Sequence, residues 1–174
     1  MDTDLMNKII AGTGHRPEKL GGYKDEVFTR LIALCSASLK KMQATEVISG
    51  MALGFDQALA IAAIELEIPL VAAIPFKGQD DKWQQQDKER YEDILFRAKQ
   101  IVYVDKTTKY STEHIGYSAE KMQKRNEYMV DHCDELLALF DGTASGTANC
   151  VNYAETQRKP VLNVWKSWVK YRGF

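Results

Sequence analysis

The sequence predicts an α/β protein, a Rossmann-like three-layer sandwich with a mostly parallel sheet of about six strands. Two observations predict this fold. Short apolar runs alternate along the chain with longer segments of helical periodicity. The apolar runs are nearly continuous, which is typical of parallel strands buried on both faces. The chain has 174 residues, the usual length of one domain, so residues 1–174 are expected to form a single domain.

The first half of the chain alternates strands and helices, separated by glycine and proline. An apolar run at 9–11 predicts the first strand and precedes a Gly-Thr-Gly loop. Apolar residues at helical spacing predict a helix from about 24 to 42. The remaining predicted elements of this half are a strand at 46–49, a helix at 57–66 and a strand at 70–74.

The second half continues the alternation. The predicted elements are a helix at 83–99, a strand at 101–104, a helix at 119–133, a strand at 136–140, a helix at 147–156 and a strand at 161–165. The polar stretch between 105 and 117 is long enough to be a lid or an interface element. The tail at 166–174 is basic and aromatic, which suits either a single-strand nucleic-acid platform or docking onto the domain. Its three-residue aromatic spacing favours docking.

Composition excludes several function classes. Lys plus Arg number 23 and Asp plus Glu number 24, giving a net charge of −1, so no global field attracts nucleic acid or an anionic membrane. The three cysteines show no CxxC spacing, and no apolar run reaches the length of a membrane span. These features predict a reduced, cytoplasmic protein. The three histidines lie in different segments, so no metal site is expected.

Ligands of open parallel sheets bind beyond the carboxyl ends of the strands, so the loops that follow these ends are the candidate sites. The first such loop is GTGHRP, in which glycines permit close backbone approach and Arg16 offers a bidentate phosphate fork. Pro17 stands where a dinucleotide fingerprint has its third glycine. The candidate ligand residues of this loop are Gly12, Thr13, Gly14, His15 and Arg16.

The second loop joins a strand to a helix and has the geometry of an anion site. Its candidate residues are Ser49, Gly50, Gly54 and Asp56. Under the alternative interpretation the glycines serve the turn and Asp56 caps the helix, and the two interpretations are compatible. After the next strand, Pro75 and Phe76 are candidate ligand residues, and Phe76, Lys77 or Trp83 is a candidate for the wall of a base or ribose pocket.

The third loop, DGTASGT, lies between an apolar strand and a helix. Small hydroxylated residues at a helix N-terminus suit a phosphate or a ribose. Helix capping alone accounts for Ser145 or Thr147 but not for both glycines of the loop. The candidate ligand residues here are Asp141, Gly142, Thr143, Gly146 and Thr147.

Several motifs carry a resemblance to known families. The segment VISGMALGFDQALAIAA resembles the SGxAxGxD strand-loop-helix of the DNA-processing protein A (Smf) family. The segment KMQKRNEYMVDHCDELLALFDGTASGT resembles the stretch leading into the PGGxGT loop of the Lonely Guy phosphoribohydrolases. Together with GTGHRP and AAIPFKGQDDKW, these segments make nearly the whole chain similar to the YpsA (YspA-type) branch of the SLOG superfamily.

The resemblance implies a nucleotide or nucleotide-derived ligand, ADP-ribose-like or a signalling nucleotide, which the protein senses or sequesters. No further cofactor is implied, and homodimers or larger homo-oligomers are expected. Arg125 matches the catalytic arginine of the Lonely Guy enzymes, and with Asn126 it is expected to contact ribose or a phosphate. The catalytic glutamate of those enzymes would fall at Cys150, after Asn149, so no carboxylate stands there. The sequence therefore favours a binding protein over an enzyme.

Two alternatives remain open. One is a nucleoside 5′-monophosphate phosphoribohydrolase-like N-glycosidase with a relocated carboxylate, for which Arg125 and Glu127 are the candidate catalytic residues and Asp131 and Asp56 are further candidates. The other is single-stranded DNA binding, by analogy with the DNA-processing proteins. The balanced net charge makes DNA binding the weaker alternative.

Overall fold

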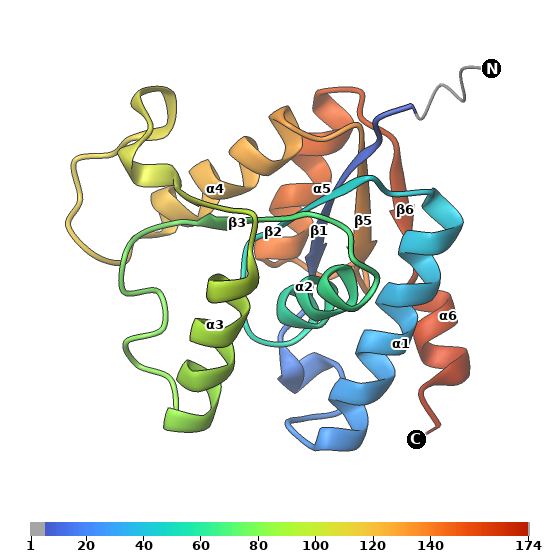
Figure 1. Cartoon of the computed structure of the whole chain (residues 1–174). Coiled ribbons are helices and arrows are strands. Elements are labelled where there is room, and N and C mark those ends of the chain that lie inside the picture. The colour runs from blue at the N-terminus through green and yellow to red at the C-terminus, as the bar shows by residue number, and fades with distance from the viewer. Residues whose placement is uncertain (1–5, 174) are drawn as a thin grey trace.

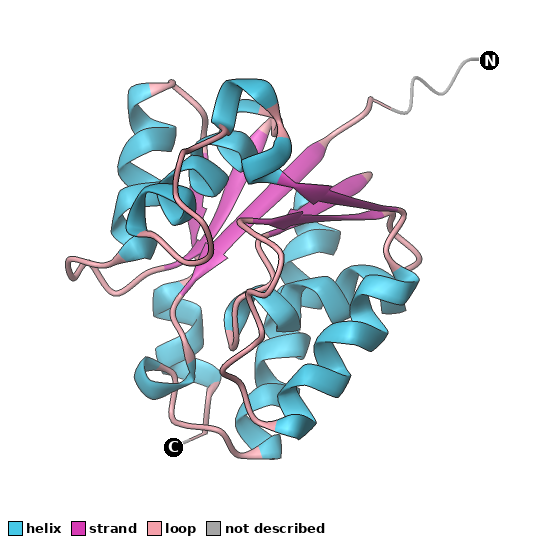
Figure 2. Cartoon of the chain, turned by 90° about the vertical axis from the view of Figure 1, so that its left-hand side faces the viewer, coloured by secondary structure: helices cyan, strands magenta, loops and turns pink. Residues whose placement is uncertain are grey.

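A wholly parallel six-stranded sheet lies between two layers of helices (Figures 1 and 2). The computed structural model describes residues 6–173. The strand order is β4-β3-β2-β1-β5-β6, and all five neighbouring pairs are parallel. The predicted Rossmann-like architecture is confirmed. The strands are β1 (Ile9–Gly14), β2 (Glu46–Ser49), β3 (Leu70–Ile74), β4 (Gln100–Tyr103), β5 (Glu135–Leu139) and β6 (Val161–Asn163).

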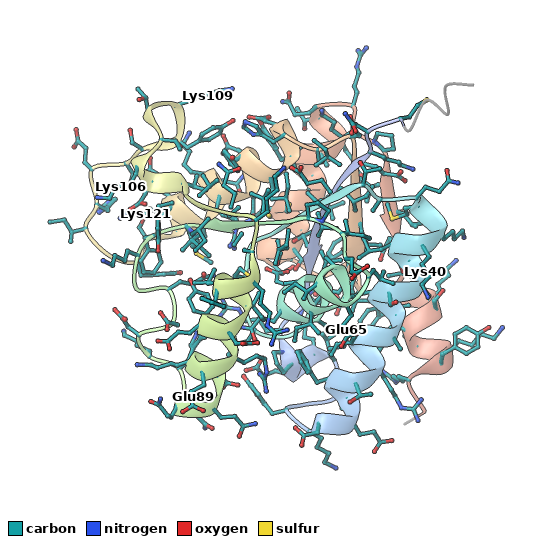
Figure 3. All side chains as sticks on the ribbon, viewed as in Figure 1. Lys40, Glu65, Glu89, Lys106, Lys109 and Lys121 are labelled. Atoms are coloured by element: carbon teal, nitrogen blue, oxygen red, sulfur yellow. The ribbon has the colours of Figure 1, made fainter. Side chains whose placement is uncertain are left out.

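Helices cover both faces of the sheet. One face carries α1 (Asp25–Met42), α2 (Phe55–Glu65), α3 (Gln85–Arg97) and α6 (Trp165–Tyr171). The other face carries α4 (Ala119–Asp131) and α5 (Gly146–Thr156). Three short 3-10 turns, η1 (Pro17–Lys19), η2 (Val104–Lys106) and η3 (Thr108–Tyr110), lie in the connections. Charged side chains such as Lys40 and Glu89 project from the outer helix faces into solvent (Figure 3).

Alternation along each strand separates two hydrophobic cores. In β1, Ile10 packs into the core under α1 and α2, whereas Ala11 packs into the core under α4 and α5. A strand buried on both faces must be apolar at every position, and β3 is buried throughout. This burial explains why the strands were recognisable as continuous apolar runs.

Two glycines that were expected in a loop belong to the first strand. β1 continues to Gly14, so the Gly-Thr-Gly segment is strand and the connection begins only at His15. A Cβ at Gly12 would overlap Leu59 of α2, and a Cβ at Gly14 would overlap Phe55. These glycines therefore allow α2 to pack directly on β1, and their position in the strand corrects the expectation that they form a loop.

The C-terminal segment differs from its prediction as well. The sixth strand ends at Asn163, and Trp165 begins α6. Trp168 is buried in the core and Trp165 packs against it, which confirms the docking interpretation of the tail, while Tyr171 is exposed. The tail's last residue, Phe174, lies outside the described residues. The other element boundaries agree with the predicted ones to within two residues.

The segment at 105–117 is anchored by its aromatic residues. Tyr110 is buried, and its hydroxyl donates a hydrogen bond of 2.6 Å to Asp131 Oδ2 of α4. Tyr117 is exposed and meets the Phe76 ring edge-on. Within residues 6–173 no helix combines the length and the apolar character needed to cross a membrane. Cys35, Cys133 and Cys150 are buried free thiols.

Candidate functional site

The strand order creates a switch point between β1 and β5. From β1 the chain proceeds to β2, β3 and β4 on one side and then returns to β5 on the other side of β1. Connections leaving the carboxyl ends of these two strands diverge, which opens a crevice where ligands of this architecture bind. A cavity of about 350 Å³ lies at this place, and we call it the switch-point cavity.

The structure brings half of the predicted ligand residues to the switch-point cavity. Those that line it are Thr13, Gly14, His15, Arg16, Asp56, Arg125, Asn126, Gly146 and Thr147. Those outside its lining are Gly12, Ser49, Gly50, Gly54, Pro75, Phe76, Asp141, Gly142 and Thr143. Sequence reasoning missed Glu18, Lys19, Ala52, Met122 and Ser145, which also line the cavity. Lys19 carried a usable signal, because it is a cation one short turn after Arg16.

The N-terminus of α5 forms one wall of this cavity. Ser145 is the N-cap and accepts a hydrogen bond of 3.1 Å from the Ala148 backbone N–H. The first N–H groups of a helix have no partner within the helix, and Gly146 and Thr147, which begin α5, line the cavity. A Cβ at Gly146 would meet nothing within 4 Å. This wall is open to an acceptor.

Arg125 of α4 brings a buried positive charge to the cavity lining. The residue is 5% exposed, and its Nη1 donates a hydrogen bond to the Gly50 carbonyl. An ideal Cβ at Gly50 would lie 2.5 Å from that nitrogen, so only glycine leaves room for the guanidinium. Gly50 thus contributes to the cavity by leaving room for the Arg125 guanidinium. Asn126 donates to the Gly146 carbonyl over 3.4 Å, which joins α4 to the start of α5.

Asp56 is the buried carboxylate of the cavity. It lies inside the first turn of α2, whose N-cap is Gly54, so the expectation that Asp56 caps this helix was wrong. Its Oδ2 accepts a 3.3 Å hydrogen bond from the Ala52 N–H, whereas Oδ1 has no hydrogen-bond partner among residues 6–173. Burial raises the pKa of Asp56 to about 6, and the nearby Arg125 charge opposes that rise.

The third loop is shaped by its own hydrogen bonds. Asp141 Oδ1 accepts from the Thr143 N–H at 2.9 Å and from the Thr143 hydroxyl at 2.6 Å, and these bonds hold the pKa of Asp141 well below its usual range. The His15 Nε2 lies 2.9 Å from Asp141 Oδ1 and 3.0 Å from the Asp141 backbone nitrogen. Burial lowers the pKa of His15, and the Asp141 carboxylate opposes that change. Asp141 and Thr143 therefore fix the loop that leads into α5.

Only one of the three candidate relocated carboxylates borders the cavity. Glu127 lies outside its lining and pairs with Lys124 at 3.7 Å along α4. Asp131 accepts hydrogen bonds from Tyr110 and Tyr153 at 2.6 and 2.8 Å, away from the cavity. Asp56 is the carboxylate that remains.

A family model described as the YspA SLOG family matches residues 10–164. This match covers all six strands and the whole switch-point cavity. The chain belongs to the YspA SLOG family. Among relatives of this family member, the SPbeta prophage-derived protein YoqJ of Bacillus subtilis (strain 168) is 40% identical over 134 residues, covering 72% of this chain and 78% of its own. A UPF0398 protein of Bacillus pumilus (strain SAFR-032) is 32% identical over 156 residues, covering 80% and 77%.

Solved structures show the same fold. DNA processing protein A from Streptococcus pneumoniae superposes with a TM-score of 0.62 at 16% identity. The alignment covers 90% of this chain but only 50% of that protein. DNA processing protein A from Helicobacter pylori gives 0.60 at 20% identity, over 92% of this chain and 67% of that one. The protein TM1055 gives 0.57 at 16% identity, over 88% and 72%. The similarity to the SLOG superfamily predicted from the motifs is confirmed.

Proposed function

We propose that this SLOG-family chain binds a nucleotide or nucleotide-derived ligand, ADP-ribose-like or a signalling nucleotide, in the switch-point cavity, in order to sense or sequester it. The observation that carries the proposal is that the open N-terminus of α5 and the buried Arg125 line one cavity. A helix N-terminus favours anions, and a guanidinium binds phosphate oxygens in pairs.

The charges of the cavity support a phosphate group. Arg16, Lys19 and Arg125 line it together with the carboxylates Glu18 and Asp56. Three cationic side chains against two carboxylates leave an excess of one positive charge in the cavity lining. The N-terminus of α5 adds the positive end of its helix dipole to the same lining.

Calorimetric titration with AMP as the probe tests the proposal. Gly146→Trp fills the open space beside the α5 N-terminus and is expected to abolish AMP binding while the protein stays folded. Asn149→Trp is the matched control, because Asn149 is exposed on the same helix outside the cavity lining and should leave AMP binding unchanged. Equal AMP affinity in wild type and Gly146→Trp overturns the proposed site.

The position of Asp56 favours a second candidate, the phosphoribohydrolase-like N-glycosidase. A buried carboxylate with an unpartnered oxygen is suited to stabilise the positive charge that develops at the ribose carbon when a glycosidic bond breaks. In that case water adds at this carbon and the free base leaves with a proton. Adenine release from AMP, measured by chromatography, should then disappear in Asp56→Asn. Absence of adenine release from a panel of monophosphates rules this candidate out.

The remaining expectations have less support. Single-stranded DNA binding is described for the Helicobacter pylori neighbour, but here burial of Trp168 removes a ring from the basic tail as a stacking platform. Homodimers or larger homo-oligomers and a reducing cytoplasmic location belong to the proposal as well. Light scattering of the purified protein tests the assembly.

A further inference from the structure

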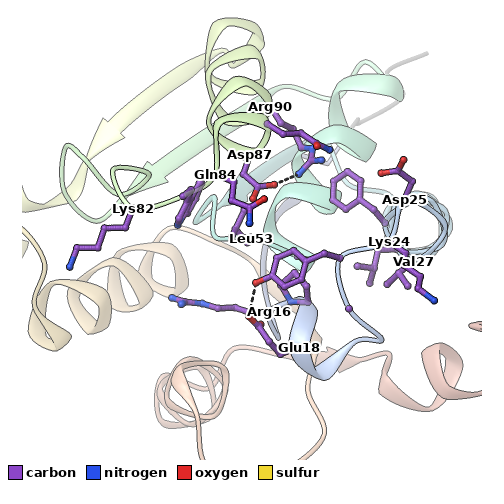
Figure 4. Close-up of a pocket in the computed structure, with 18 residues that line it drawn as sticks. Arg16, Glu18, Lys24, Asp25, Val27, Leu53, Lys82, Gln84, Asp87 and Arg90 are labelled. Carbon is purple, nitrogen blue, oxygen red and sulfur yellow. Dashed lines mark hydrogen bonds and ion pairs between the residues drawn. The ribbon is translucent and has the colours of Figure 1, made fainter.

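A second and larger cavity lies on the other side of η1. It has a volume of about 540 Å³ and lies between η1, the start of α1 and the start of α3 (Figure 4). We call it the side cavity. Arg16 and Glu18 line both cavities, so both cavities border η1. The loop before α2 adds Leu53 and Gly54 to the wall.

The side cavity offers flat surfaces. Three aromatic side chains, Tyr23, Phe28 and Trp83, line it. The guanidinium of Arg90 lies over the Phe28 ring, with 4.7 Å from Cζ to the ring centroid, and its Nη1 donates to Asp87 at 3.1 Å. This pairing holds the planar guanidinium in place, and both guanidinium and aromatic faces stack on heterocycles.

The indole of Trp83 is held in a similar way. Its ring meets the buried Tyr91 of α3 edge-on, with 5.3 Å between ring centroids and an interplanar angle of 87°. Tyr23 is more exposed, and its hydroxyl donates a 2.5 Å hydrogen bond to Glu18. Figure 4 shows Glu18 and Arg16 at one end of the cavity and Asp87, Gln84 and Arg90 along another wall.

The aromatic side chains distinguish the side cavity from the switch-point cavity. Four cationic side chains and three carboxylates line the side cavity, the same excess of one positive charge as in the switch-point cavity. Among the described residues no Phe, Tyr or Trp lines the switch-point cavity, whereas three such rings line this one. Gln84 and Gln86 add amide donors and acceptors. A flat polar ring fits this combination of stacking surfaces and amide groups.

We propose that the side cavity binds the nucleobase-like ring of the ligand, stacked beside Trp83 and Tyr23, while the phosphate of the same ligand lies in the switch-point cavity. Arg16, which lines both cavities, contacts the phosphate end of the ligand. The proposal rests on the proposed function and specifies that its ligand is recognised through its base as well as through its phosphate.

Two probes that differ in one ring test the inference. AMP carries an adenine that ribose 5-phosphate lacks. Calorimetric titration is expected to give an affinity about tenfold or more higher for AMP, the order of effect of stacking one base on an aromatic side chain. Tyr23→Ala and Trp83→Ala should remove this advantage while the affinity for ribose 5-phosphate stays unchanged.

The controls separate the two proposals. Tyr171→Ala removes a similarly exposed ring outside both cavity linings and should retain the full preference for AMP. Tyr23 is exposed, so its variant reports on binding even where Trp83→Ala unfolds. Equal affinities for the two probes, or a preference that survives Tyr23→Ala, overturn the side-cavity assignment and leave the proposed function standing. Failure of both probes to bind wild-type protein overturns both proposals.

Discussion

Replacing Asp56 by Asn should change how the stability of the protein depends on pH. Burial raises the pKa of this carboxyl from 3.8 to about 6. The folded state therefore holds a proton that the unfolded state has lost between these two values, and stability decreases as pH rises through this range. The difference of about 2 pKa units corresponds to about 3 kcal/mol when Asp56 is fully ionised.

Urea denaturation of wild type and Asp56→Asn at several pH values between 4.5 and 7 measures this contribution. About 2 of these kcal/mol fall within that window. The free energy of unfolding of wild type, relative to the variant, should decrease by that amount as pH rises, whatever the constant offset caused by leaving Arg125 without its carboxylate. The groups common to both proteins cancel in the difference. A difference that stays constant from pH 4.5 to pH 7 refutes the assignment of Asp56 as a buried, desolvated acid.

Further substitutions test the packing around the site and the docking of α6. Gly50→Ala places a Cβ 2.5 Å from Arg125 Nη1. This substitution should lower the free energy of unfolding by about 1–3 kcal/mol and should also lower the affinity for AMP. Unchanged values of both quantities would contradict the role of Gly50 in leaving room for Arg125. Gly14→Ala should lower the melting temperature, because the added Cβ overlaps Phe55. Gly146→Ala should leave the melting temperature within a few degrees of wild type, because its Cβ meets nothing within 4 Å. Equal melting temperatures for the two variants would refute this distinction. Trp168→Ala should lower the free energy of unfolding, measured by urea denaturation, by about 3–5 kcal/mol, because this side chain is buried in the core. A decrease as small as that caused by replacing the exposed Tyr171 with Ala would show that α6 does not dock as described.

The order of strands and helices could be predicted because the strands of this fold are strongly apolar and alternate with helices. Strands such as β3 are buried on both faces and must be apolar at each position. The end of β1 was not predictable, because Gly12 and Gly14 signal a loop by residue type, and only the contacts with α2 show that they belong to a strand.

The start of α6 could not be predicted from the sequence for a different reason. Val161 to Trp165 is an apolar run interrupted only by Asn163, so it has the composition of a strand. In the structure Asn163 Oδ1 accepts from the N–H groups of Phe140 and Trp165, at 3.2 and 3.1 Å. Those bonds end β6 and turn the chain into the helix. They depend on Phe140, which is distant in sequence.

The switch-point cavity was partly predictable, whereas the side cavity as a whole was not, although Trp83 was a candidate for the wall of a base or ribose pocket. The connections after β1, β2 and β5 placed Arg16, Asp56 and Gly146 near one another, because the carboxyl ends of parallel strands meet at one edge of the sheet. The side cavity combines η1 with the starts of α1 and α3. These segments share no motif, and their packing alone brings Tyr23 and Trp83 to one space.

The most direct test of the central claim is a titration of isotope-labelled protein with AMP, followed by amide nuclear magnetic resonance. The phosphate is expected to accept hydrogen bonds from the N–H groups of Gly146 and Thr147 at the start of α5. Their amide signals should therefore move more than any others, and move downfield, as AMP is added. Signals of Gly146 and Thr147 that stay in place at saturating AMP, or shifts confined to another part of the chain, would contradict the proposed site.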